Sequence, residues 1–587
     1  MPSITINGER HEFTPGEKIL QVANRAGQEI PQYCYHPGLS IPAQCRICLA
    51  EVWAPNPRNN NKLEPLMGGK LLPTCATECS DGMVVYTNSP KAVANQKAVM
   101  EYLLINHPID CAVCDQAGEC FLQDYSYRYG RGVSRFEEQK VKNPKKDIGE
   151  HILLYSDRCI LCTRCVRFAW EVSQTSELMI AGRGNKSEID VFPGVGFDNE
   201  LSGNVVDLCP VGALLDKDFL FKQRVWFLKQ TPSIDGLTAS GDNIFIEHNE
   251  GKVYRVKPRQ NMNVNKWWIT DEVRYGWKFV HAPDRLRSPM RRQYGVQVEA
   301  DYTRAYDEAI AGLRRARDAG GRVALVVSPM LPCEEAYRLA EFALAIDPEA
   351  ALAVGPVPFA GEDRHYPPSV PADDPAAFHV SAEKAPNARG VRRVLAAITG
   401  RPAVEFDDLA PRLGEFAAVV VTGNYPSAWA TEELASALSG KFLVVIDTLP
   451  NLLTEQADVV LPGATWAEKA GTFENRRNML QAFEAAIPVV PMAKTEGQIA
   501  NDLLAVLGGE DLRRFIPRTG VLVVDEGPGQ VPAATEVTNI PRAKLFNAAE
   551  VRAEMARAHS ELDVFVSEIT LPTGRTEIEA DMTMVEL

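Results

Sequence analysis

The sequence predicts a multidomain chain of mixed α/β and α+β class, with a metal-rich N-terminal part followed by a larger α/β part. Of its thirteen cysteines, twelve lie before residue 210, and Cys333 stands alone in the remainder. Beyond residue 320, short apolar runs typical of buried strands alternate with segments of helical periodicity, which indicates a mainly parallel sheet. A length of 587 residues is enough for several such domains.

The composition excludes some classes of protein. A net charge of −15 argues against a nucleic-acid surface, because binding phosphates needs concentrated Lys and Arg. The longest apolar runs, such as "VALVV" and "AAVVV", are far shorter than the ~20 residues of a membrane helix. The start, "MPSITINGERHEF", lacks the basic and apolar regions of a signal peptide. We therefore expect a reducing cytoplasm, where clustered cysteines indicate metal or redox chemistry rather than disulfides.

The first ~80 residues are predicted to form a small β-rich module that holds a metal centre. "ITING" and "HEFTP" read as strands joined by an Asn7-Gly8 hairpin turn, and "KILQVANRAGQ" as a helix ending at Gly27. Four cysteines follow with gaps of ten, two and twenty-six residues, which is the broad pattern of a [2Fe–2S] ferredoxin site. A four-thiolate zinc site is the alternative, and Cys79 has no assigned role. The four predicted ligands are Cys34, Cys45, Cys48 and Cys75.

A second set contains three cysteines, one short of a four-ligand site. Cys111, Cys114 and Cys120 are separated by two and five residues, and His107 lies upstream. A neutral imidazole is a competent ligand, and histidine replaces cysteine at some iron–sulfur irons. Pro108 disfavours a helical His107, so the chain could fold back around a cluster. From spacing alone, His107 is either the fourth ligand or a hydrogen-bond donor beside the site.

The third set has the most specific spacing. In "DRCILCTRC" three cysteines are each two residues apart, and a remote Cys-Pro follows after forty-three residues, as in many [4Fe–4S] ferredoxin sites. Zinc would accept this spacing too, but it fits an iron–sulfur cluster better. The predicted ligands are Cys159, Cys162, Cys165 and Cys209. Three arginines surround the loop and either balance cluster charge or belong to a solvated surface: Arg158, Arg164 and Arg167.

Taken in order, these sets resemble the large iron–sulfur subunit (the G subunit) of respiratory NADH:quinone oxidoreductase, complex I. The resemblance is carried by "YCYHPGLS", "CRICL", "HPIDCAVCDQAGEC" and "RCILCTRCVRF", and it covers about the first 220 residues. It implies a β-grasp ferredoxin-like [2Fe–2S] domain over 1–90 and a [4Fe–4S] ferredoxin-like domain with two clusters over 91–220. In that family the position of His107 is a cluster ligand, which completes the second set. Related modules occur in NAD-linked hydrogenases and formate dehydrogenases.

The remaining chain resembles a different fold. "GGRVALVVS", "FAAVVVTGNYP" and "KFLVVIDTLP" read as buried strands near helical segments such as "CEEAYRLAEFALAI" and "TEELASALS". The segment Ala457–Phe483 resembles a motif of molybdopterin oxidoreductases, and "GKVYRVKPRQNMNVNKWWITDEVRYGW" resembles the short domain that introduces that fold. The resemblance implies a short domain over 221–285 and an α/β domain over 286–490. The region 491–587 has no assignment.

Some features of that fold are missing from the sequence. Active members often carry another four-cysteine cluster where "TPSIDGLTASGDN" stands, but no cysteine lies between residues 209 and 333. Cys333 in "SPMLPCEEA" lacks support as a molybdenum ligand and is expected to be an ordinary helix-start cysteine. Neither a Gly-x-Gly-x-x-Gly fingerprint after a strand nor a P-loop is present. We therefore expect no molybdopterin, flavin or NAD in this chain.

Three clusters that exchange single electrons are best interpreted as a conduit for electrons. The resemblance implies an electron-transfer subunit in the peripheral arm of NADH:quinone oxidoreductase, a translocase, with no catalytic residue of its own. Its partners would be a flavin- and NADH-binding subunit and other peripheral-arm subunits, at the cytoplasmic face of the inner membrane, without nucleic acid or direct membrane insertion. The alternatives are the iron–sulfur chain of an NAD-linked hydrogenase or formate dehydrogenase, and a zinc-stabilised scaffold.

Overall fold

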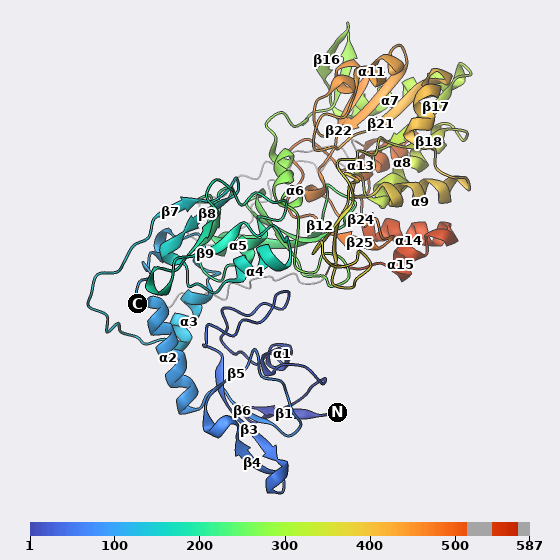
Figure 1. Ribbon diagram of the computed structural model, residues 1–587. Coiled ribbons are helices and arrows are strands. Elements are labelled where there is room, and N and C mark those ends of the chain that lie inside the picture. The colour runs from blue at the N-terminus through green and yellow to red at the C-terminus, as the bar shows by residue number, and fades with distance from the viewer. Residues whose placement is uncertain (513–542, 573–587) are drawn as a thin grey trace, which may run out of the picture. The chain divides into compact units, whose positions relative to one another are not determined.

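The computed structural model describes residues 1–512 and 543–572. Contacts divide the chain into two compact units. In Figure 1 the first is blue to teal except for a short yellow segment, and the rest of the chain from green to red is the second. The first comprises Met1–Leu228 together with His365–Ala377, and the second comprises Lys229–Arg364 and the described residues from Phe378 onward. Parts of the unassigned region 491–587, residues 513–542 and 573–587, lie outside the described residues.

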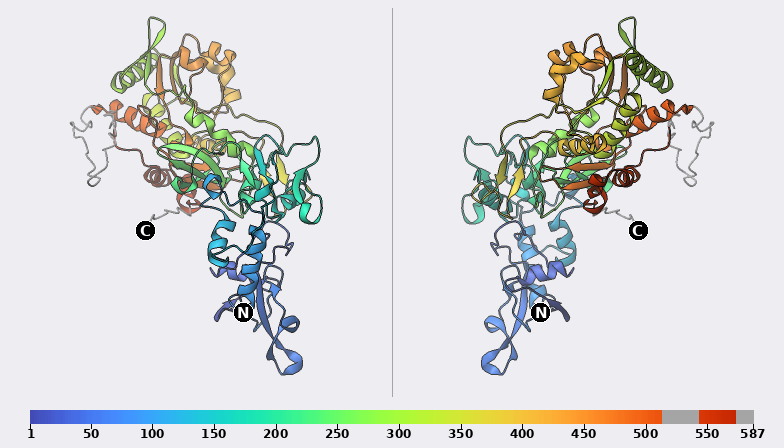
Figure 2. Two further views of the ribbon diagram at one scale, coloured as in Figure 1. Left: turned by 90° about the vertical axis from the view of Figure 1, so that its left-hand side faces the viewer. Right: turned by 90° about the vertical axis from the view of Figure 1, so that its right-hand side faces the viewer.

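The first unit begins with a β-grasp-like module. β1 (Ser3–Ile6) and β2 (Glu9–Glu12) form the predicted hairpin, and Asn7 and Gly8 both have the positive φ, 49° and 96°, that its two-residue turn requires. β1 also pairs in parallel with β6, and the sheet order is β2-β1-β6-β3-β4, with β5 beside β3. The hairpin of β3 and β4 extends from the rest of the sheet (Figure 2). The other elements are α1 (Ile19–Arg25), β3 (Leu49–Asn56), β4 (Lys62–Pro65), β5 (Leu72–Pro73) and β6 (Val84–Tyr86).

The rest of the first unit holds short elements linked by long loops. α2 (Pro90–Leu104) is capped by Ser89, whose Oγ accepts the N–H of Ala92 at 3.3 Å. A small antiparallel sheet has the order β11-β8-β7, and β9 and β10 form a separate hairpin. The other elements are α3 (Phe121–Tyr129), β7 (Lys145–Asp147), β8 (Ile152–Tyr155), α4 (Arg164–Glu171), β9 (Leu178–Ala181), β10 (Glu188–Val191), α5 (Asn204–Leu208) and β11 (Leu214–Asp216).

The second unit begins with a three-stranded antiparallel meander and continues into a seven-stranded mixed sheet. The meander consists of β12 (Lys229–Ile234), β13 (Asn243–Asn249) and β14 (Lys252–Pro258), followed by α6 (Asp271–Tyr275). The large sheet has the order β16-β15-β23-β22-β21-β17-β18, and its five strands from β23 to β18 are parallel. The predicted buried runs form β17, β21 and β22, which confirms the α/β interpretation. The strands are β15 (Met290–Gln293), β16 (Val296–Glu299), β17 (Arg322–Val327), β18 (Ala351–Val354), β21 (Phe416–Thr422), β22 (Phe442–Asp447) and β23 (Val459–Pro462).

Helices cover both faces of this sheet and bury an apolar cluster against each. One cluster joins side chains of α7, α8, α9 and α13 to the sheet, and the described part of the region after 490 contributes Ile499, Leu503, Met555 and Phe565 to it. α8 begins at Cys333, which is fully buried, as predicted for a helix-start cysteine. The remaining elements are α7 (Tyr302–Asp318), α8 (Cys333–Ile346), β19 (Arg364–Tyr366), β20 (Phe378–Val380), α9 (Ala388–Thr399), α10 (Phe406–Leu409), α11 (Glu432–Leu438), α12 (Leu452–Gln456), β24 (Gly471–Glu474), β25 (Leu480–Phe483), α13 (Glu496–Leu507), α14 (Ala548–Ala558) and α15 (Val564–Ser567).

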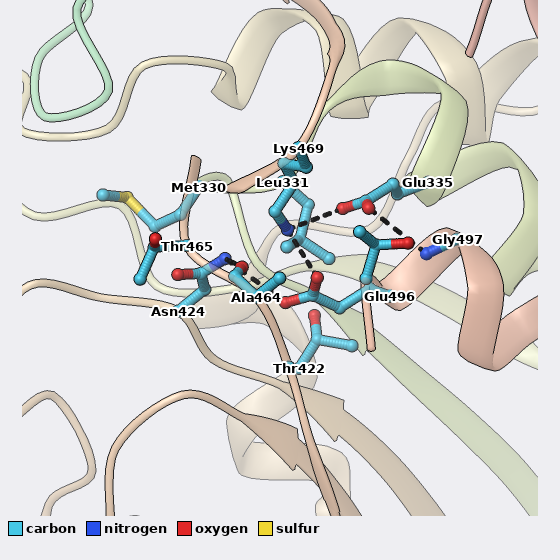
Figure 3. A network of polar contacts seen from close by, with 12 residues as sticks. Met330, Leu331, Glu335, Thr422, Asn424, Ala464, Thr465, Lys469, Glu496 and Gly497 are labelled. Atoms are coloured by element: carbon cyan, nitrogen blue, oxygen red, sulfur yellow. Dashed lines mark hydrogen bonds and ion pairs between the residues drawn. The ribbon is translucent and has the colours of Figure 1, made fainter. Parts of the chain in front are cut away.

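A fully buried ion network lies where α8 and α13 meet the sheet (Figure 3). The Nζ of Lys469 lies 2.8 Å from Glu335 and also donates to Glu496. Glu335 also accepts the N–H of Gly497 at 3.3 Å, and Glu496 accepts from the side-chain amide of Asn424 at 3.2 Å. One cation cannot neutralise two carboxylates. Burial therefore raises the pKa of Glu335 to about 8, against the opposing effect of Lys469, and the carboxyl holds a proton at neutral pH.

This network predicts a pH dependence of stability for the second unit. The pKa of Glu335 is raised by folding from an unfolded value of about 4.3, so the folded state binds the extra proton between these two values. The free energy of unfolding should then fall as pH rises from about 5 to 8, by about 1.4 kcal/mol for each unit of pKa difference. Glu335→Gln should flatten this dependence in urea unfolding measured across that range.

The control for this experiment is Glu415→Gln. Glu415 is exposed, and a hydrogen bond from Arg412 lowers its pKa, so it is already ionised throughout the range. The control should keep the pH dependence of the parent protein. Equal slopes for Glu335→Gln and the parent would show that Glu335 is ionised in the folded state.

Candidate metal centres

The structure brings the four cysteines of the first set together. Cys34, Cys45 and Cys48 lie in the loop between α1 and β3, and Cys75 follows β5. The thiols of Cys34 and Cys45 share a hydrogen bond, as do those of Cys48 and Cys75, and Cys75 also interacts electrostatically with Cys34 and Cys45. Three of the four side chains are almost fully buried. Cys79 is not among these contacts, and burial raises the pKa of its thiol to about 11.

The pairing of these thiols favours metal binding. The hydrogen bond from Cys34 lowers the pKa of Cys45 to about 5, while the pKa of Cys34 itself is raised by the same bond. The hydrogen bond from Cys75 lowers the pKa of Cys48 to about 7, and again the donor's pKa is raised. In each pair the hydrogen bond thus favours the ionised form of the thiol that accepts it. Thiolate is the form that binds metal, so these hydrogen bonds favour metal binding by Cys45 and Cys48.

The four cysteines of the third set line one cavity. Its walls also contain the apolar side chains of Leu154, Ile160, Ile189, Val211 and Leu214, together with Arg164. Burial raises the pKa of Cys159 to about 12 and of Cys162 to about 11, and it raises the pKa of the other two thiols as well. Binding a metal would displace these protons. A cavity lined by four thiols and mainly apolar side chains fits a [4Fe–4S] cluster, and the ligands predicted from the sequence are Cys159, Cys162, Cys165 and Cys209.

The second set is less tightly assembled. Cys114 and Cys120 are buried and interact electrostatically, Cys111 acts on Cys114, and Cys120 directly precedes α3. The ring of His107 accepts the N–H of Ile109 at Nδ1, at 3.2 Å. Burial lowers the pKa of His107, which favours the neutral imidazole that a metal requires. The charged groups that act on this ring include Asp110 and Arg158, and ligation by His107 stays a prediction.

Strained backbone occurs at each of the three sets. Non-glycine residues with positive φ are uncommon and costly, most of all for β-branched side chains such as Ile109 and Thr163. Residues in this conformation turn consecutive N–H groups toward one side, which suits an anionic group. The N–H of Leu161, for example, donates to Sγ of Cys159 at 3.3 Å. The residues and their φ values are Ala43 (51°), Arg46 (58°), Ile109 (53°), Leu161 (52°) and Thr163 (63°).

The second and third sets are in contact. A Cβ added at Gly212 would lie 2.3 Å from Sγ of Cys114, so only glycine allows this approach. The N–H of Phe121, next to Cys120, donates to the carbonyl of Pro210 at 3.0 Å. The sequence analysis did not predict a role for Gly212. Its position three residues after Cys209 was a signal that the backbone there approaches another cysteine closely.

One apolar cluster links all three sets. It is built from Tyr33, Ile47, Met100 and Val211 among others, and cysteines from each set pack into or against it. Tyr33, next to Cys34, is fully buried and stacks edge-on against Tyr125 with ring centroids 5.3 Å apart. The cysteines at this cluster are Cys45 of the first set, Cys120 of the second, and Cys159, Cys162 and Cys209 of the third.

The three arginines near the third set are buried, so the solvated-surface alternative is wrong. Arg158, Arg164 and Arg167 are 2%, 5% and 8% exposed. Arg158 forms an ion pair with Asp110 at 2.5 Å and stacks over the ring of Tyr155 at 4.1 Å.

Within residues 1–512 and 543–572, no three His, Cys, Asp or Glu side chains are arranged to hold a single metal ion.

Comparison with known families assigns the same order of modules. The matched models are a 2Fe-2S iron-sulfur cluster binding domain over residues 2–90 and the NADH-ubiquinone oxidoreductase-G iron-sulfur binding region over 96–135. A ferredoxin-like domain of NADH-quinone oxidoreductase subunit 3 matches 149–215, and the molybdopterin oxidoreductase family matches 395–506. These matches and the sheets confirm the predicted fold class. A NuoG-like 4Fe-4S domain matches 228–278, a segment without cysteine, so it offers no thiolate.

Curated relatives of this chain include longer proteins named as subunits of NADH oxidoreductases. The G subunit of NADH-quinone oxidoreductase from Rickettsia felis is 40% identical over 306 residues, which is 52% of this chain and 43% of that protein. The mitochondrial NADH-ubiquinone oxidoreductase 78 kDa subunit of Neurospora crassa is 38% identical over 343 residues, or 58% and 44% of the two chains. This chain thus spans less than half the length of these relatives. A crystal structure of NAD+-reducing [NiFe]-hydrogenase in the H2-reduced state matches 38% of this chain and 91% of that chain, with 26% identity and a TM-score of 0.32.

The contact at Gly212 predicts a selective loss of iron. Gly212→Ala should displace Cys114 and cause loss of the iron bound at the second set, because the new Cβ has no room beside Sγ. The measurement is iron content together with EPR of the reduced anaerobic protein. The matched control is Gly132→Ala, since nothing lies within 4 Å of a Cβ at Gly132. Full iron content in Gly212→Ala would show that this approach has no role at the second set.

Proposed function

We propose that this chain carries single electrons along three iron–sulfur clusters within an NADH:quinone oxidoreductase. The observation that carries the proposal is the shared apolar cluster, because it joins all three cysteine sets in one continuous packed region. Homology to the large iron–sulfur subunit of that enzyme over the matched part supports it. Both curated relatives described above are named as subunits of NADH oxidoreductases, which favours this function over the hydrogenase alternative.

The proposed ligands are those predicted from the sequence. The first set would hold a [2Fe–2S] cluster, and each of the other two a [4Fe–4S] cluster. Molybdopterin, flavin and NAD are not proposed for this chain. The ligands are Cys34, Cys45, Cys48 and Cys75 in the first set, His107, Cys111, Cys114 and Cys120 in the second, and Cys159, Cys162, Cys165 and Cys209 in the third.

The surrounding residues would prepare each site for electron transfer. Iron–sulfur clusters supply one-electron chemistry when bound. Apolar side chains such as Leu154 and Val211 exclude water from the third set, so the cysteines meet a low dielectric. The N–H of Leu161, which donates to Sγ of Cys159, favours negative charge on that sulfur. Potential and stability would thus be set by these groups rather than by bulk solvent.

Partner subunits would complete the reaction. A hydride donor needs a two-electron acceptor first, normally a flavin, so a flavin- and NADH-binding subunit is proposed as the electron donor. Further peripheral-arm subunits would pass electrons toward quinone in a proton-translocating enzyme at the cytoplasmic face of the membrane. Among the described residues, none of the helices has the length and apolar character needed to span a bilayer. The α/β unit is proposed as a scaffold for neighbouring subunits.

Metal content and reducibility test this function. The anaerobic chain should contain about ten iron and ten sulfide, from one [2Fe–2S] and two [4Fe–4S] clusters, and no molybdenum. Dithionite should bleach its visible absorption, but NADH alone should not until the flavin-bearing partner is added. Stoichiometric zinc with little iron would refute the proposal. Rapid bleaching by NADH alone would reveal a nucleotide site in this chain.

His107 provides a second test. A neutral imidazole in place of a thiolate removes one negative charge, which favours the reduced cluster and raises its potential, as in Rieske centres. His107→Cys should therefore lower the potential of the second cluster, by about tenfold in its equilibrium constant or about 59 mV for one electron. His107→Ala should make this cluster labile. Both are measured by EPR-monitored redox titration.

The control for His107 is Cys79→Ser, because Cys79 lies outside the three sets. It should leave iron content, signals and potentials unchanged. If His107→Ala gave the signal, potential and iron content of the parent, histidine would not be the ligand. The fourth position of the second set would then belong to another residue.

A further inference from the structure

Two buried guanidinium groups near the third set lack a carboxylate partner. Arg164 and Arg167 lie on α4, the helix that also carries Cys165. Within the described ranges, no carboxylate oxygen forms an ion pair with either group at 4.0 Å or less. The carboxylate of Glu171 acts on Arg167 at longer range and is hydrogen-bonded to Ser40. Arg158 differs, because it is paired with Asp110.

The two groups instead bind backbone carbonyls beside the cysteines of two sets. Arg164 donates to the carbonyl of Tyr35 at 2.5 Å and to that of Leu208, next to Cys209, at 3.2 Å. Arg167 donates to the carbonyls of Cys34 and Ser40. These bonds join the first cysteine loop to the third across more than 120 residues of sequence.

The thiols of both sets also interact electrostatically with these cations. Cys162 and Cys34 act on both guanidinium groups, Cys209 acts on Arg164, and Cys165 acts on Arg167. Burying an unpaired charge costs several kcal/mol, and carbonyl dipoles offset only part of that cost. Clusters bound by four thiolates would carry net negative charge, and at the first and third sets they would supply the compensating charge for this pair.

We propose that Arg164 and Arg167 form a shared electrostatic bridge that holds the first and third ligand loops together and raises the reduction potentials of both clusters. This inference rests on the proposed function. Each cluster takes up one electron from its donor, without breaking a bond or moving a proton, and so gains one negative charge. A fixed cation nearby stabilises that added charge, and one pair of cations serves two clusters because it lies against both loops.

The test uses Arg164→Gln and Arg167→Gln in the full chain, prepared anaerobically. Glutamine still donates to a carbonyl but carries no charge. EPR-monitored redox titration should show lower midpoint potentials for both the [2Fe–2S] cluster and the [4Fe–4S] cluster of the third set. We expect about a tenfold change in each equilibrium constant, or about 59 mV for one electron. Arg164→Lys and Arg167→Lys should bring both potentials back toward those of the parent.

Arg183→Gln is the matched control, because Arg183 is exposed between β9 and β10 of the same unit. It should leave both potentials unchanged. A shift in only one cluster, or in neither at full iron content, would overturn the bridge. If the glutamine variants lose iron, the lysine variants decide, since lowered potentials despite the retained charge would overturn it. Absence of iron–sulfur signals from the parent chain would refute the proposed function itself.

Discussion

Burial of thiols in apolar surroundings governs the construction of the first unit. Burial by itself raises the pKa of a thiol, as at Cys159 and Cys162, and a bound cation then stabilises the thiolate. At Cys45 and Cys48 a hydrogen bond from a neighbouring thiol outweighs the effect of burial. The loops therefore need groups that tolerate negative charge. The N–H of Leu161 and the buried arginines provide them, and cysteines of all three sets pack into or against the shared apolar cluster.

The second unit also buries ionisable side chains, but it compensates their charge with other side chains of the protein. In its buried ion network Lys469 lies between Glu335 and Glu496, and a proton on Glu335 removes the excess negative charge. The charged side chains of this network therefore contact one another where α8 and α13 pack on the sheet. A packed sheet of this kind is a rigid support, in keeping with the scaffold role proposed for it.

Local signals in the sequence predicted much of the fold. The Asn7-Gly8 turn, the apolar runs of β17, β21 and β22, and the spacing of the cysteines depend on neighbouring residues and could be interpreted from them. The hydrogen bonds of Arg164 and Arg167 could not be predicted in this way, because their acceptors in the first cysteine loop lie more than 120 residues away in the sequence. The packing of α13 onto the α/β core was missed for a similar reason. The spacing of His107 and the three cysteines left two roles for the histidine open, and its ligation stays a prediction that rests on the family resemblance.

The contact between Cys114 and Gly212 has a consequence for biogenesis. The second set cannot adopt its final shape until residue 212 has been synthesised and folded back, since Gly212 forms one wall beside Cys114. The third set depends on the same segment, because Cys209 is the last of its four cysteines in the sequence. Insertion of the proposed clusters at the second and third sets would therefore follow synthesis of the chain to at least residue 212.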